Sequence, residues 1–113
     1  MVVTPDEGLA IGNAIAKMHR QHYGRGPATV RTVSDRDHIV VFLHDIYTTV
    51  ERTLIDDGNF DVVHATRRAF QQTMRPTFIE HVEQITGRTV VAFMSEVHQS
   101  PDLAAEMFVL ASE

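Results

Sequence analysis

The chain has 113 residues, of which 43% are hydrophobic and 22% are charged. This length suits one domain with one hydrophobic core, and the composition is typical of a folded globular protein. The formal net charge of −5 argues against a nucleic-acid-binding protein, and the absence of cysteine excludes disulfides, thiolate catalysis and cysteine-bound metals. We therefore expect a single domain over residues 1–113 that has no nucleic-acid partner.

The apolar segments of the chain indicate where the protein is located in the cell. No apolar run is long enough to cross a membrane, so direct membrane insertion is not expected. The segment Met1–Glu7 lacks the basic-then-apolar layout of a signal peptide, which predicts a cytoplasmic protein.

Residues 17–36 carry five basic side chains against one acid, whereas residues 37–113 carry twelve acids against five arginines. The basic stretch either attracts an anionic ligand or complements the negative end of a helix.

The first half of the chain is expected to form a helix and a hairpin. Apolar residues at three- and four-residue steps predict a helix over residues 6–23, which Gly24 and the pair Gly26-Pro27 would end. β-Branched residues predict a strand over residues 28–33. A polar turn over residues 34–37 then leads to a second, strongly apolar strand over residues 38–44.

The second half is expected to contain two helical segments and two strands. Thr48, three residues before Glu51, is a capping-box signature that predicts a short helix ending near Gly58. Helical periodicity continues over residues 60–85, where Pro76 predicts either a kink or two abutting helices. The remaining strands are predicted over residues 89–97 and 106–111, with a loop or short helical turn between them.

The resulting order of elements is α-β-β-α-α-β-β. Hairpin-length connections favour an α+β fold, a two-layer sandwich in which a four-stranded, mainly antiparallel sheet has its helices on one face. Such a sheet has two open edges, and open strand edges tend to pair, which predicts a homodimer.

Four arginines are the candidates for a small-anion site. Arg25 lies in the glycine-rich loop over residues 24–27, and Arg31 follows in the same basic stretch. Arg68 lies on the polar face of the long helix, and Arg67 lies beside that face. Guanidinium groups bind carboxylates and phosphates through paired hydrogen bonds. The structural alternatives are a helix stop for the loop and a solvated, ion-paired face for the helix.

Signals for metal binding and catalysis are weak. His19 and His22 are three residues apart and could share a helix face, but a structural zinc site needs four ligands and a catalytic one usually needs three. No serine lies in a GxSxG elbow, and no serine, histidine and acid form a recognisable set. The residues favour a protein that is not an enzyme, with no catalytic residues, no metal and no other cofactor.

Several short motifs occur together in a fixed order. A helix runs into Gly24-Arg25-Gly26-Pro27, an apolar strand leads to Thr48-x-x-Glu51-x-x-Leu54, and Arg67 and Arg68 precede Gly87 and a closing strand with Phe108. From about residue 12 to residue 110, this pattern resembles the MpsC-like family, whose label refers to a Na⁺-translocating, membrane-potential-generating system. The resemblance implies a small soluble protein or domain linked to membrane transport, and it supplies no catalytic residues.

Within that resemblance, Gly24, Gly26, Pro27, Thr48 and Glu51 correspond to pattern positions, and each already has a structural explanation in the sequence. The family pattern often has lysine between the two glycines. Arginine at this position keeps the positive charge but has a planar guanidinium in place of a compact ammonium.

Three hypotheses of different classes follow. The leading one is a non-catalytic, dimeric accessory or regulatory domain that docks on a membrane-transport protein, since an anionic leaflet would repel this acidic chain. The alternative is a small-anion or nucleotide sensor that uses the four arginines, which requires them to converge in the fold. The third, a metal-dependent hydrolase built on His19 and His22, requires at least one further ligand.

Overall fold

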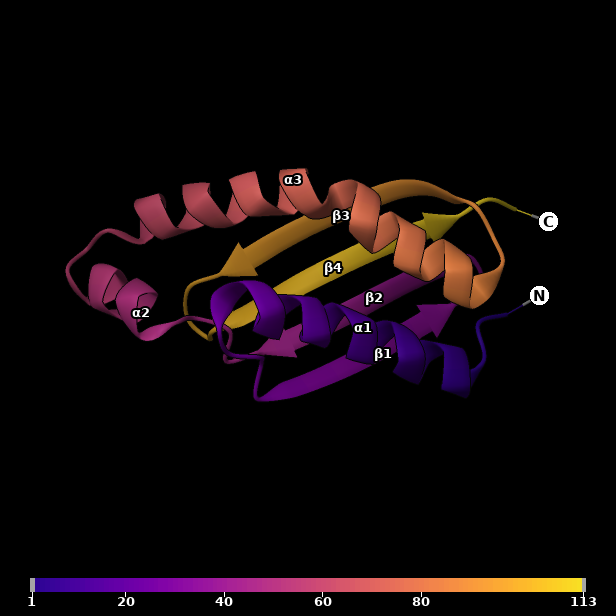
Figure 1. The fold of residues 1–113 in the computed structure, drawn as a ribbon, viewed down its shortest axis with the longest axis horizontal. Coiled ribbons are helices and arrows are strands. Elements are labelled where there is room, and N and C mark those ends of the chain that lie inside the picture. The colour runs from indigo at the N-terminus through magenta and orange to yellow at the C-terminus, as the bar shows by residue number, and fades with distance from the viewer. Residues whose placement is uncertain (1, 113) are drawn as a thin grey trace.

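The computed structural model describes residues 2–112 as a sheet covered on one side by helices (Figure 1). The helices are α1 (Pro5–Tyr23), α2 (Thr49–Asp56) and α3 (Phe60–Thr86). The strands are β1 (Thr29–Asp35), β2 (His38–His44), β3 (Val90–His98) and β4 (Leu103–Leu110). They pair in the order β1-β2-β4-β3, and every neighbouring pair is antiparallel. The predicted α+β class and the predicted order of elements are therefore confirmed.

The two faces of the sheet differ because side chains alternate along each strand. In β2, the side chains of Ile39, Val41 and Leu43 are buried in the core, whereas those of Val40 and Phe42 point to the other face and stay partly exposed. Figure 1 shows α1 and α3 side by side over one face, with α2 at the end of the molecule. The core therefore lies between the sheet and the helices α1 and α3.

Local signals fix the ends of the helices. Thr48 accepts a hydrogen bond from the backbone N–H of Glu51 at 3.1 Å, and the Glu51 side chain accepts one from the N–H of Thr48 at 2.9 Å, which confirms the predicted capping box. Thr4 and Glu7 form a second capping box at the start of α1. Gly24 ends α1 in the left-handed conformation, at φ 78°.

The long helix α3 passes through Pro76 without ending. Proline removes one backbone donor and crowds the preceding turn, which bends a helix. Figure 1 shows the axis of α3 changing direction near its middle. Of the two predicted outcomes, the structure has a single bent helix and not two abutting ones.

The second hairpin differs from the prediction at its turn. Strand β4 begins at Leu103, which pairs with His98, so the expected loop shrinks to residues 99–102. The run Leu103-Ala104-Ala105 has weak strand propensity, and pairing with two neighbouring strands overrides it. In β3, a register shift between Val90 and Ala92 leaves Val91 61% exposed, so Val91 does not share the buried face of Phe93 and Val97, where alternation along an unbroken strand would place it.

Candidate functional site

A buried ion pair joins α2 to α3. Arg67 is 2% exposed, and its Nε and Nη2 donate to the two carboxylate oxygens of Glu51 at 2.7 and 2.6 Å. The same guanidinium donates to the backbone oxygen of Ile46 at 3.0 Å and stacks over the Tyr23 ring, 3.6 Å from its centroid. Burial alone would raise the pKa of Glu51, but the Arg67 guanidinium and the Thr48 N–H lower it below its usual value. Both charges are therefore fully partnered.

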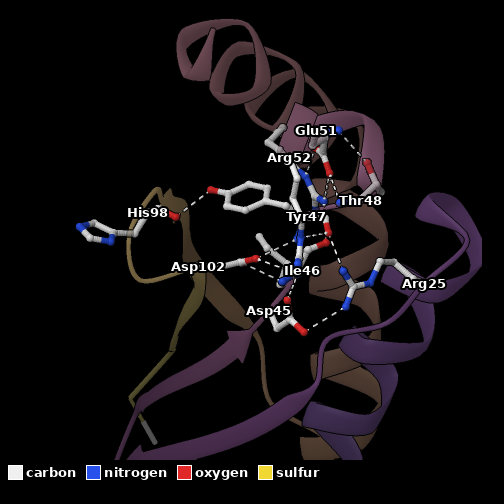
Figure 2. A network of polar contacts seen from close by, with 10 residues as sticks. Arg25, Asp45, Ile46, Tyr47, Thr48, Glu51, Arg52, His98 and Asp102 are labelled. Atoms are coloured by element: carbon white, nitrogen blue, oxygen red, sulfur yellow. Dashed lines mark hydrogen bonds and ion pairs between the residues drawn. The ribbon is translucent and has the colours of Figure 1, made fainter. Parts of the chain in front are cut away.

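A polar network holds residues 45–48, the connection between β2 and α2 (Figure 2). Asp102 accepts hydrogen bonds from the backbone N–H groups of Ile46 and Tyr47 at 2.8 and 3.3 Å. Tyr47 in turn donates its hydroxyl to the backbone oxygen of His98 at 2.8 Å. Arg25 donates to the backbone oxygen of Tyr47 at 2.6 Å and to Asp45 at 3.2 Å. Three loops that are distant in sequence are thereby tied together at one end of the sheet.

The four candidate arginines do not form one site. Arg25 and Arg67 both bind the connection between β2 and α2, and each already has a carboxylate partner. Arg31 is exposed on β1, on the face of the sheet that α1 and α3 leave uncovered. Arg68 lies on α3 at the mouth of a cavity. In this structure, therefore, Arg25 and Arg67 act as structural residues, while Arg31 and Arg68 point to two separate surfaces.

The uncovered face of the sheet has an apolar centre. We call it the open face and define it by the outward side chains of all four strands. Cross-strand register places Val33, Val40, Met107 and Met94 in one row across the sheet. The exposed fractions of Val33 and Met94, at the two ends of this row, are 49% and 52%. Large apolar side chains thus reach solvent along a continuous line.

The next row carries opposite charges at its two ends. It runs from Arg31 through Phe42 and Ala105 to Glu96. Arg31 forms no ion pair with any residue that the structure describes, whereas Oε1 of Glu96 lies 2.7 Å from Nε2 of His64. The apolar centre therefore has polar residues at its rim, which is the usual organisation of a protein–protein interface.

Glu106 is the most unusual residue of the core. It lies in the central strand β4, is 0% exposed, and neither carboxylate oxygen has a hydrogen-bond partner among the described residues. Burial raises the pKa of Glu106 to about 8, although the Ser95 hydroxyl and the Arg67 charge oppose the rise. This carboxyl is therefore mostly protonated at neutral pH.

Sequence reasoning missed Glu106, although the signal was present. In the alternation of β4, Glu106 shares a face with Phe108 and Leu110, so a carboxyl at that position had to enter the core. Tyr47 and Asp102 were also missed. Their roles depend on contacts between loops 51 to 56 residues apart in the sequence, which no local pattern reveals.

The two histidines of the predicted pair differ, because His19 occupies a core position and His22 is exposed. His19 is 4% exposed, and burial, together with the charges of Arg67 and His22, lowers the pKa of its imidazole to about 4. Its ring lies 6.4 Å from that of Phe78 in a stacked arrangement. Across residues 2–112, no group of three or more histidine, cysteine or acidic side chains is placed to hold a metal ion.

Together these features define a small α+β domain with one partnered polar cluster at its end and one uncovered apolar sheet face. The chain belongs to the family described as MpsC, Na⁺-translocating membrane potential-generating system, which matches residues 9–112. This membership associates the chain with a Na⁺-translocating membrane system. Within the described residues, no helix is long and apolar enough to cross a membrane. No curated protein and no solved structure shows significant similarity to the chain.

Proposed function

We propose that this chain is a non-catalytic accessory or regulatory domain that acts through protein–protein contacts in the membrane system named by its family. The main support is the open face, because an apolar centre with a polar rim is built for another protein surface. The absence of cysteine suits the reducing cytoplasm, where we place the domain. Its net negative charge favours docking on a protein of the membrane system over docking on anionic lipid.

The partner that fits the open face is a second copy of the chain. Homodimers are usually built around a twofold axis, so the same surface must complement itself. A twofold axis parallel to the strands, between β2 and β4, places β1 of one copy over β3 of the other. The same rotation places β2 over β4, because the strand order is β1-β2-β4-β3.

This rotation matches side chains within each row. Arg31 of one copy lies over Glu96 of the other, and Phe42 lies over Ala105, so opposite charges meet and a large side chain meets a small one. Glu96 lies on the edge strand with its Oε1 bound to His64 of α3, so its carboxylate turns toward the open face when it pairs with the arginine. Symmetry produces each of these contacts twice, at the two sides of the interface.

The molar mass in solution tests the dimer. Light scattering after size exclusion should give twice the 12.7 kDa chain mass for the wild-type protein. Phe42→Asp should give the monomer mass, because it places a charge in the apolar centre. Val62→Asp is the matched control, since Val62 is 49% exposed on α3, and it should remain dimeric. If the wild-type protein is still a monomer at about 100 micromolar, a concentration on the order of the Kd of a weak dimer, the dimer proposal is wrong.

Charge reversal tests the twofold arrangement itself. Arg31→Glu and Glu96→Arg should each weaken the dimer, because like charges then face each other. The double variant should restore it, since the pair is re-formed with its signs exchanged. A dimer that is insensitive to both single changes would place the interface elsewhere, for example at the strand edges.

The accessory role needs a separate measurement in cells. Membrane potential can be followed in cells that lack this protein and are supplied with the wild-type chain or a variant. The wild-type chain and Val62→Asp should restore the potential, whereas Phe42→Asp should not. Full restoration by Phe42→Asp would show that the open face is not needed for function, even if the purified chain is dimeric.

The alternative function, a small-anion or nucleotide sensor that uses Arg25, Arg31, Arg67 and Arg68, stays a prediction. The observation that favours an anion-binding role is the cavity at Arg68, which also contains a second arginine.

A further inference from the structure

A cavity of about 240 Å³ lies between α3 and the edge strand β3. Its lining residues alternate between the helix and the strand: Arg68, Gln71, Gln72 and Arg75 come from α3, and Phe93, Met94, Ser95 and Glu96 come from β3. The volume is that of several water molecules or of one small organic acid.

The inner wall of this cavity is polar. Gln71 is a lining residue that is 6% exposed, and its amide forms no hydrogen bond with any residue that the structure describes. Ser95 also lies on this wall, with its hydroxyl buried beside the Glu106 carboxyl, its cross-strand neighbour. Polar groups in the interior of folded proteins are almost always hydrogen-bonded. An amide without a protein partner on the wall of a cavity therefore favours a polar occupant.

The charges around the cavity favour an anion. Arg68 and Arg75 are seven residues apart, so they lie about two turns apart along one face of α3. Arg75 is held in place, because it donates to the backbone oxygen of Phe93 at 3.0 Å and lies over the Phe93 ring. Arg68 forms no hydrogen bond or ion pair with the described residues. Its donors are therefore available.

The acids near the cavity cancel only part of this charge. Glu96 is the one acid in the lining, it is bound to His64 and to the backbone N–H of Val97, and the charge of Arg68 helps to lower its pKa. Two arginines against one carboxylate still leave the cavity positive. Glu106 lies behind Ser95, its cross-strand neighbour, and faces Arg67 from α3 and Tyr23 from α1. With its raised pKa it is mostly neutral at pH 7 and does not repel an anion.

We propose that the cavity between α3 and β3 is a binding site for a small oxyanion, such as a carboxylate, sulfate or phosphate group. Arg68 and Arg75 bind the charged oxygens, and the Gln71 amide binds the polar atoms that reach the inner wall. This site differs from a four-arginine cluster, because it uses one of those arginines and takes its other groups from the same face of α3.

The experiment is a titration of the full chain with sodium sulfate, and separately with sodium succinate, followed by NMR amide shifts at constant ionic strength. Both probes keep their charge above pH 6.5. Saturable shifts that centre on residues 68–75 and 93–96 are expected. Arg68→Gln should weaken binding at least about tenfold, as expected for the loss of a charge-assisted hydrogen bond.

Arg36→Gln is the matched control. Arg36 is an exposed arginine in the turn between β1 and β2, outside both the cavity lining and the open face, so sulfate affinity should stay within about twofold of the wild type. Gln71→Leu should weaken binding without removing any charge. Equal losses in Arg68→Gln and Arg36→Gln would show non-specific charge attraction and overturn the site. Shifts that do not saturate with either probe would overturn it as well.

Discussion

Two buried carboxyl groups of this domain have opposite environments. Glu51 is bound through both oxygens by Arg67 and also caps α2, so its charge is fully partnered and its pKa is lowered. Glu106 is more deeply buried, has no hydrogen-bond partner among the described residues, and has its pKa raised to about 8. The first carboxyl holds three chain segments in one arrangement. The second lies in the core behind the polar cavity, with Ser95 as its cross-strand neighbour.

The largest expected effect comes from removing the arginine that pairs with the Glu51 carboxylate. Arg67→Ala leaves the Glu51 carboxylate buried without its cation and also frees the backbone oxygen of Ile46. We expect the free energy of unfolding to fall by about 3 to 5 kcal/mol, the usual cost of removing one member of a buried pair. Urea unfolding followed by circular dichroism measures this directly.

The neighbouring arginine provides the control for this change. Arg68→Ala removes an exposed side chain that forms no hydrogen bond or ion pair with the described residues, so its effect should stay within about 0.5 kcal/mol. If the two substitutions cost the same, the Glu51–Arg67 pair contributes no special stability and the contrast with Glu106 disappears.

The next effect concerns the unpartnered carboxyl and appears as a pH dependence. The pKa of Glu106 is about 8 in the folded chain, above its ordinary value of 4.5, so between these values the folded chain holds more protons than the unfolded one. Stability must therefore fall as pH rises through this window, by at most about 1.4 kcal/mol per pH unit. Glu106→Gln should remove that slope.

His19 determines where this slope can be seen. Its folded pKa is about 4, below the ordinary histidine value of 6.5, so its contribution makes stability rise with pH between those values and opposes Glu106 there. The window from about pH 6.5 to pH 8 is free of this opposition. In that window the wild type should lose stability with rising pH while Glu106→Gln stays flat. Parallel curves for the two proteins would mean that Glu106 titrates near its ordinary pKa.

The sequence predicts the fold of this molecule better than it predicts the candidate sites. Helix ends and the order of elements along the chain follow local rules, such as the Thr48–Glu51 capping box and the left-handed Gly24, and these predictions are confirmed. The grouping of arginines could not be predicted, because adjacent residues on a helix point in different directions. Arg67 is buried against Glu51 while Arg68 faces a cavity. The start of β4 was also missed, since its alanines show their strand conformation only through pairing.

The smallest expected effect concerns two tyrosine hydroxyls. Like the two carboxyl groups, one has a hydrogen-bond partner and the other has none, but both hydroxyls are uncharged. The Tyr47 hydroxyl donates to the backbone oxygen of His98, whereas the Tyr23 hydroxyl is buried and has no hydrogen-bond partner within the described part of the chain. Tyr47→Phe should cost about 1 kcal/mol, the net value of one hydrogen bond, while Tyr23→Phe should be neutral or slightly stabilising. Thermal unfolding of the two variants side by side measures the difference. A cost for Tyr23→Phe as large as that for Tyr47→Phe would show that its hydroxyl is satisfied in solution, and water in the polar core would then account for Ser95 and Glu106 without any ligand.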